Sequence, residues 1–323
     1  MESRMFKGMI RKKTSLALVA LLVVMFILPN VIPRFYVYLI ASILVMALLA
    51  MSLNLVVGFG GLYQFHHGVF YGVGAYAIAL LLTKTSLPKW ICFISAPFVA
   101  ALAGLIIGLI CIRLSKLYFA MIQISLGSLL WALAFRWYSF TGGDDGIHGI
   151  PMPSIMSGLS NSYYFILIIF VVCITALYLI LKSPFGSTLQ AARDNEQRCE
   201  AIGVFVKRHQ LIAIVIASFF AGIAGVLFVV LEGSVFPDLL FWSLSLEILI
   251  MCLLGGWFTF AGPIIGTAIM LSLRTFIGIQ TEYWTLILGI ILALLIFFLP
   301  QGVWGYFLEK FQHRKEAVAE RGQ

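Results

Sequence analysis

The segment 182–207 concentrates charged side chains in a chain that is otherwise 62% apolar. Within it, Asp194 precedes Arg198 by four residues, the favourable order for an ion pair on one face of a helix. Gly203 stands where it can end that helix. Residues of these types at this spacing favour ion pairing and docking rather than catalysis. We therefore predict a surface helix that binds a soluble partner, with a solvated connector as the alternative.

The residues before these charges predict where that helix begins. Ser183 and Pro184 open a four-residue breaker that ends the preceding apolar helix, and Ser187 and Gln190 have the spacing of a capping box. The predicted helix begins near Thr188 and covers 188–202.

Other ionisable groups fall inside apolar runs, where burial is costly and each is a functional candidate. Glu247 and Arg274 lie at similar predicted depths, so a structural ion pair competes with a role in a solute pathway. His66 and His67 are placed near the cytoplasmic boundary, where packing histidines are favoured over a proton relay or ligand. Asp144 and Asp145 occur in a glycine-rich stretch, 141–151, where a capped turn is favoured over a cation site.

Signals for an enzyme, a cofactor or a metal are missing from the sequence. It has no G-x-x-x-x-G-K-[ST] phosphate loop, and the glycines of 72–77 lie in an apolar run rather than in a strand-turn-helix. The five cysteines have neither disulfide nor metal-ligand spacing. We predict no catalytic residue, no cofactor and no metal.

Composition defines the elements that must carry these residues. Only 11% of the 323 residues are charged, and crossing a membrane takes about 20 apolar residues in a helix. The fold class predicted is an all-α polytopic membrane protein with one permease domain, 16–305. This domain includes a loop, 183–209, and lies between a basic N-terminus, 1–15, and a charged tail, 306–323. We expect ten membrane-embedded segments, some of them short or broken: 16–33, 36–57, 65–83, 90–112, 117–139, 163–182, 210–231, 243–256, 260–279 and 283–300.

The distribution of Lys and Arg predicts the orientation. With the N-terminus in the cytoplasm, sixteen of the 21 basic residues lie inside, and the outer side keeps Arg34, Lys84, Lys89, Arg136 and Arg274. Both termini are then cytoplasmic, and the net charge of +8 faces anionic lipid, with no need for nucleic acid. A re-entrant segment at 65–83 would instead move Lys84 and Lys89 inside.

Two glycine-rich stretches interrupt the helical pattern at 58–68 and 254–263. Non-helical backbone at membrane depth must be covered by protein or line a cavity. The second stretch looks like the turn of a helical hairpin or a broken helix. The two share a Gly-Gly-x-aromatic-polar-Phe pattern at an offset of 195 residues, which hints at an internal duplication. The pairs Gly68 and Gly72, and Gly262 and Gly266, are expected to let helices approach closely.

Several sequence motifs together resemble those of one known protein family. The run 61–81, with His67, Phe70 and Gly72-Val73-Gly74-Ala75-Tyr76, resembles the G-x-x-S-L-G-H-x-x-F-x-x-I-G-A-Y stretch of LivM-type permeases, the membrane subunits of branched-chain amino acid ABC importers. Further stretches match in the same order at 118–121, 141–151, 183–203, 254–263 and 298–302, so the likeness covers about 40–305. Gln64 and His66 depart from the Ser and Gly that the family usually has there.

The resemblance implies a function and a set of partners. Such a permease pairs with a related, LivH-like subunit in the bacterial inner membrane, docks two cytoplasmic ATPase subunits and receives solute from an extracytoplasmic binding protein. It implies that coupling to the ATPases involves Arg193, Asp194, Asn195, Glu196, Glu200 and Gly203. Pathway or structural roles are predicted for His67, Phe70, Tyr76, Glu247, Gly255 and Gly256. A permease for urea or short amides, an ion-coupled secondary transporter and a channel stay open as alternatives.

Overall fold

A computed structural model describes residues 20, 22–114, 116–280, 283–298 and 302–306. Most of the described part is helix, and the only β pairing in it is an isolated bridge between Ile147 and Val235. The predicted N-terminal region, 1–15, and the tail beyond 306 lie outside the described residues. The all-α prediction is confirmed.

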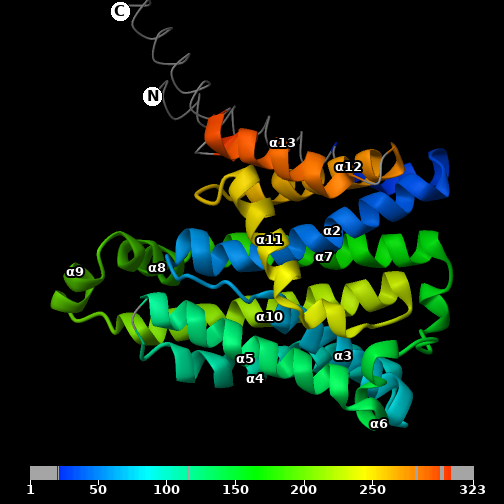
Figure 1. Ribbon diagram of the computed structural model, residues 1–323, viewed down its shortest axis with the longest axis horizontal. Helices are drawn as coiled ribbons and strands as arrows, with labels where there is room; N and C mark the ends of the chain where they lie inside the picture. Colours follow the sequence, from blue (N-terminus) through cyan, green and yellow to red (C-terminus); the bar gives the residue numbers. More distant parts are fainter. Residues whose placement is uncertain (1–19, 21, 115, 281–282, 299–301, 307–323) are drawn as a thin grey trace, which may run out of the picture.

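Six helices in the described residues are long and apolar enough to cross a membrane. They run side by side along the long axis of the molecule (Figure 1). These helices are α2 (Arg34–Asn54, continued by the π-helical turn η1, Leu55–Phe59), α4 (Lys89–Cys111), α5 (Lys116–Arg136), α7 (Leu159–Lys182), α10 (Val206–Glu232) and α12 (Gly262–Gln280). The chain is therefore a multi-pass membrane protein.

The remaining apolar helices are shorter than a full crossing. They are a helix at Leu22–Val31, α3 (Gly68–Lys84), α11 (Trp242–Gly255) and α13 (Trp284–Phe298). Two pairs of short elements mark the ends of the bundle. One end carries α8 (Pro184–Asp194) and α9 (Glu196–Ala201), and the opposite end carries α6 (Tyr138–Thr141) and η2 (Gly143–Asp145). We call them the α8–α9 end and the α6 end.

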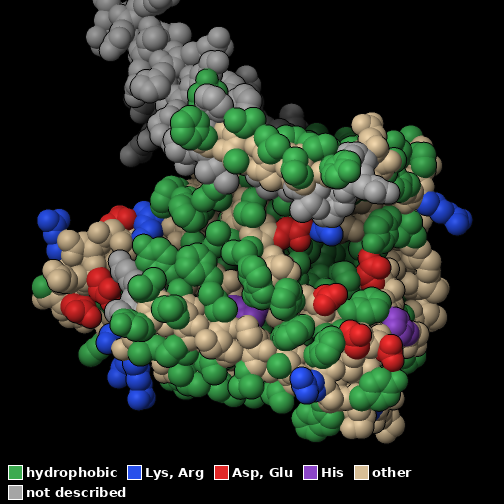
Figure 2. All heavy atoms as spheres, in the orientation of Figure 1, with side chains coloured by type: hydrophobic (Ala, Val, Ile, Leu, Met, Phe, Trp, Pro, Cys, Tyr) green, Lys and Arg blue, Asp and Glu red, His purple; other side chains and the backbone are tan. Residues whose placement is uncertain are grey.

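Hydrophobic side chains cover the visible sides of the bundle, and Lys and Arg gather mostly over the α8–α9 end (Figure 2). The centre is built around α10, which packs against α4, α3 and α2. A Cβ on Gly225 would lie 2.1 Å from the carbonyl oxygen of Tyr71, so α10 and α3 touch backbone to backbone. Small residues permit such contacts between membrane helices, where dispersion rather than water exclusion drives packing.

Two further segments, 60–84 and 233–255, each combine a short apolar helix with an irregular stretch before it. Residues 60–67 run inward from the α8–α9 end, where Gly61 lies against Arg193, and α3 continues from there to the α6 end. Residues 233–241, which include the 3-10 helix η4 (Pro237–Leu240), run inward from the α6 end, where Val235 pairs with Ile147, and α11 then runs across the bundle toward α12. The two helices begin next to each other, because the backbone N–H of Gly68 donates to Ser245 Oγ at 2.9 Å.

The helices of segments 65–83 and 243–256 have 17 and 14 residues, so both belong to the short elements that the sequence predicts. One prediction is corrected: His66 and His67 are wholly buried in the interior rather than near a boundary.

The chain nevertheless crosses at α3 rather than re-entering. Lys84 Nζ donates to the carbonyl of Ser139 at 2.8 Å, and Lys89 Nζ donates to that of Met152 at 3.0 Å. Both acceptors belong to the α6 end. The two lysines therefore lie opposite α8 and α9, as the charge count requires.

The predicted hairpin at 254–263 is confirmed. Helix α11 ends at Gly255, α12 begins at Gly262, and the two pack along each other. A Cβ on Gly266 would lie 2.0 Å from the carbonyl oxygen of Met251, which explains the small residue. Gly256 has φ of +105°, a backbone conformation that a residue with a side chain rarely adopts.

Candidate functional site

The charged segment begins one turn earlier than the sequence predicts. Helix α8 starts at Pro184, with Ser183 as its N-cap and the N–H of Gly186 donating to Ser183 Oγ at 3.5 Å. Proline suits the first helical position, because its missing N–H would be unpaired there in any case. The predicted capping residues are helical instead. The Gln190 side chain donates to the carbonyl of Gly186 at 3.2 Å.

Asn195 splits the predicted helix 188–202 into α8 and α9. Its backbone is extended, at φ −157° and ψ 100°, and its side-chain oxygen accepts the N–H of Arg198 at 2.9 Å as the cap of α9. Asparagine favours such caps over helix interiors. The break removes the register for the predicted Asp194–Arg198 pair, and Asp194 binds Arg193 instead at 2.8 Å. Gly203, with φ of +87°, follows the end of α9 as predicted.

Arg193 fastens α8 to the bundle. Its Nη1 donates to the carbonyl oxygen of Gly58 at 2.8 Å, and its guanidinium carbon lies 5.2 Å from the ring centroid of Phe258. A Cβ on Gly61 would lie 2.5 Å from Arg193 Cγ, so the close contact depends on that glycine. We call these four residues the Arg193 junction.

The Arg193 junction connects the two glycine-rich stretches, 58–68 and 254–263, that share a sequence pattern. Gly58 belongs to η1 at the end of α2, and Phe258 belongs to the turn between α11 and α12. At the end of α2, before the first stretch, the side chain of Asn54 donates to the carbonyl of Thr259 in the second stretch at 3.2 Å. A displacement of α8 would therefore act on α2 and α12 together. The internal duplication itself stays a prediction.

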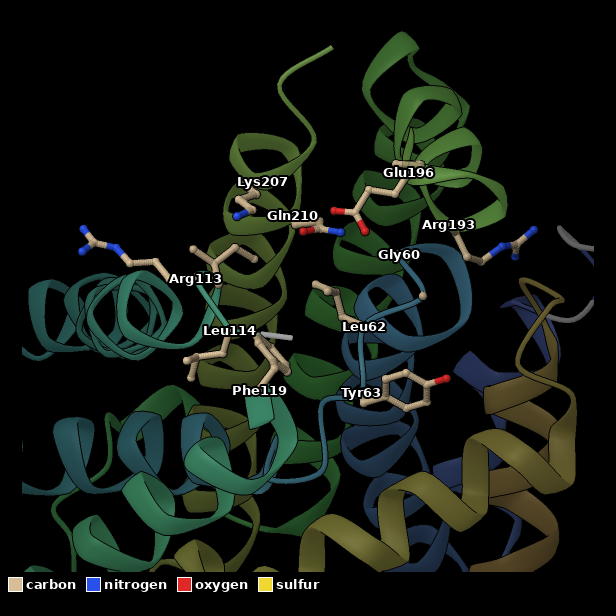
Figure 3. Close-up of a pocket in the computed structure, with 13 residues that line it drawn as sticks. Gly60, Leu62, Tyr63, Arg113, Leu114, Phe119, Arg193, Glu196, Lys207 and Gln210 are labelled. Carbon is tan, nitrogen blue, oxygen red and sulfur yellow. The ribbon is translucent and has the colours of Figure 1, made fainter. Parts of the chain in front are cut away.

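A cavity of about 350 Å³, which we call the Glu196 cavity, opens beside the junction. Its wall comes from residues 60–63, the connection between α4 and α5, the α8–α9 segment and α10. The Glu196 carboxylate points toward Gln210 and Lys207, whereas the Arg193 side chain points away (Figure 3). Glu200, also predicted as a coupling residue, is exposed on α9. The sequence did not reveal this cavity, because its wall comes from four separate stretches.

The other predicted residues lie outside the wall of this cavity. Phe70 is wholly buried with its ring 5.7 Å from that of His67, and Tyr76 is 5% exposed. Gly255 packs against α12, where a Cβ would lie 1.8 Å from the carbonyl oxygen of Gly262. The predicted ion pair is present, with Arg274 Nη1 at 2.6 Å from Glu247 Oε1.

The acidic stretch at the α6 end is a turn. His148 Nε2 donates to the carbonyl of Asp145 at 2.7 Å, and the Tyr138 hydroxyl donates to Asp145 Oδ2 at 3.1 Å. The second bond raises the pKa of Tyr138 above its usual value. No group of three or more His, Cys, Asp or Glu side chains suited to a metal occurs in the described part of the chain.

Comparison with known proteins identifies the family. Residues 35–297 match the family described as the branched-chain amino acid transport system permease component. The chain belongs to this family. It is 30% identical over 319 residues to the high-affinity branched-chain amino acid transport permease LivM of Escherichia coli K12, covering 90% of this chain and 75% of LivM.

Two further relatives extend the comparison. LivM of Salmonella typhimurium has the same identity and coverage. LivH of Salmonella typhimurium is 23% identical over 286 residues, covering 80% of this chain and 91% of LivH. No solved structure matches the chain. These relatives are transport permease components rather than enzymes, and they point to a multi-subunit transporter.

Proposed function

We propose that this protein is the LivM-type permease subunit of an ATP-driven importer that moves branched-chain amino acids into the cytoplasm. The observation that carries the proposal is the 30% identity to LivM across 90% of the chain. Its partners are a LivH-like permease subunit, two cytoplasmic ATPase subunits and an extracytoplasmic binding protein. The α8–α9 end faces the cytoplasm of a bacterium, and the binding protein delivers solute at the α6 end. Both chain termini are cytoplasmic.

The coupling step follows from the Arg193 junction. Closure of the ATPases on nucleotide displaces α8 and α9, and Arg193 transmits this movement to η1 and to the turn before α12. Ordered helices transmit such a movement as rigid elements. The Glu196 cavity forms the cytoplasmic mouth through which solute leaves. This chain supplies the pathway and the coupling, and ATP hydrolysis takes place on the partner subunits.

Uptake by whole cells tests the substrate class. Deletion of the gene is expected to reduce uptake of labelled leucine, isoleucine and valine from micromolar solutions and to leave urea uptake unchanged, with recovery from a plasmid copy. Loss of urea or acetamide uptake with normal leucine uptake would instead support an amide permease and overturn the proposal.

A further inference from the structure

Three polar side chains with unpaired atoms are buried where α3 and α11 begin. Gln64, His66 and Gln123 are at most 1% exposed. Gln64 and His66 belong to the non-helical stretch before α3, and Gln123 belongs to α5. A Cβ on Gly127, one turn beyond Gln123, would lie 1.7 Å from His66 Nδ1, which places the His66 ring against α5. We call these three residues the polar core.

The neighbouring His67 is fully paired and serves as a contrast. Ser52 Oγ donates its hydrogen to the carbonyl of Leu49 at 2.7 Å, so it accepts from His67 Nε2 at 2.8 Å. His67 Nδ1 is then the unprotonated nitrogen and accepts from Gln64 Nε2 at 2.8 Å. His67 is therefore a neutral structural group that holds Gln64 in place.

The polar core itself is not paired. His66 Nε2 donates to the carbonyl of Leu240 at 3.1 Å, and the ring edge that carries Nδ1 lies against the backbone of α5. Within the described residues, His66 Nδ1, Gln64 Oε1 and both amide atoms of Gln123 have no hydrogen-bond partner. A buried polar group without a hydrogen-bond partner destabilises the fold. Unpaired buried atoms of this kind require an explanation, and a bound ligand or water would supply the missing partners.

The backbone adds a matching electrostatic feature. Helices α3 and α11 have 17 and 14 residues, and both begin at this depth, with the Gly68 N–H bound to Ser245 Oγ at the first turn of α11. Helix N-termini carry partial positive charge and unpaired N–H groups, and half-helices that begin inside membrane transporters direct these toward anionic solute groups.

The polar core also lies next to the cavity of the α8–α9 end. Gln64 directly follows Tyr63, and Gln123 lies one helical turn beyond Phe119; Tyr63 and Phe119 both line the cavity (Figure 3). Along α5, the polar core and the cavity are therefore one helical turn apart. A solute on its way out through the cavity would pass the polar core first.

We propose that the polar core binds the zwitterionic end of the transported amino acid within this subunit. The three unpaired acceptors, His66 Nδ1, Gln64 Oε1 and Gln123 Oε1, match in number the three N–H groups of an α-ammonium. Gln123 Nε2 and the two helix N-termini supply donors and positive potential for the carboxylate. The inference rests on the proposed function, because it names the solute class that this function supplies.

Replacing Gln123 with methionine tests the inference. The substitution keeps the volume and removes two unpaired polar atoms, so the assembled transporter is expected to be at least as heat-stable as wild type. Uptake of radiolabelled leucine into proteoliposomes, with loaded binding protein and ATP, is expected to fall about tenfold, the effect of losing one hydrogen bond to a charged group. Gln280→Met, at the exposed end of α12, is the matched control and should keep wild-type uptake.

A second variant tests charge. Gln123→Glu keeps the shape but places an acceptor where the carboxylate needs a donor, and it is expected to lower leucine uptake at least as much. Wild-type uptake in either variant would overturn the inference, and so would a loss of uptake that Gln280→Met shares. Absence of leucine uptake by the wild-type complex would instead overturn the proposed function.

Discussion

Replacing Arg193 with alanine is expected to uncouple ATP hydrolysis from transport while the helix bundle stays folded. Its hydrogen bond to Gly58 and its contact with the Phe258 ring are the links from α8 to η1 and to the turn before α12. A hydrogen bond from a charged group contributes about 1.5–3 kcal/mol, which corresponds to a fall of about tenfold to a hundredfold in leucine transported per ATP hydrolysed. Reconstituted transporter, assayed for both quantities in one preparation, gives this ratio.

A matched control separates the junction from a general loss of positive charge. Arg136→Ala removes an exposed arginine at the far end of α5, at the α6 end, and should leave the ratio unchanged. Arg193→Lys keeps the charge without the planar guanidinium and should give an intermediate ratio. A wild-type ratio for Arg193→Ala would show that the movement reaches the bundle by another contact.

Replacing Gly127 with alanine is expected to destabilise the fold, although alanine favours an isolated helix by about 1 kcal/mol over glycine. The added Cβ would lie 1.7 Å from His66 Nδ1, and the His66 ring is held by its bond to Leu240. Overpacking of a buried site typically costs about 1–3 kcal/mol, so the clash outweighs the helix propensity. Thermal unfolding of the purified protein in detergent should begin at a lower temperature.

The double variant His66→Gly with Gly127→Ala removes the clash and should recover most of the lost stability. Gly289→Ala in α13 is the control, because a Cβ there would meet nothing within 4 Å. If His66→Gly does not rescue Gly127→Ala, the close packing of these two residues is not the cause of the loss.

The sequence predicts those features that depend on local chemistry or on composition. Hydropathy predicts the long helices, and glycine predicts the end of α9 at Gly203, because only a positive φ is required there. The Glu247–Arg274 pair is predictable, because two opposite charges at similar depth in apolar segments find few other charged groups to pair with.

Depth and continuity are harder to predict. An apolar run such as 65–83 has the same hydropathy whether its first residues are helical or irregular, so the sequence places His66 at a boundary although it lies in the interior. The break at Asn195 is not predicted for a different reason. The i, i+4 spacing of Asp194 and Arg198 favours one continuous helix, and the side chain of Asn195 competes successfully by capping a second one.

Gln123 gave only a weak signal. It is a single amide in an apolar segment, and nothing in its local sequence distinguishes a lipid-facing amide from a buried one. Its importance appears only when His66 and Gly127, which are distant in sequence, are found side by side. The Glu196 cavity is likewise formed by tertiary contacts alone.

The most direct test of the account measures leucine uptake by proteoliposomes that contain this chain with its LivH-like and ATPase partners. We predict uptake only when ATP and the loaded binding protein are both present, with no effect of a proton or sodium gradient. Uptake driven by an ion gradient in the absence of ATP would contradict the account and establish a secondary transporter instead.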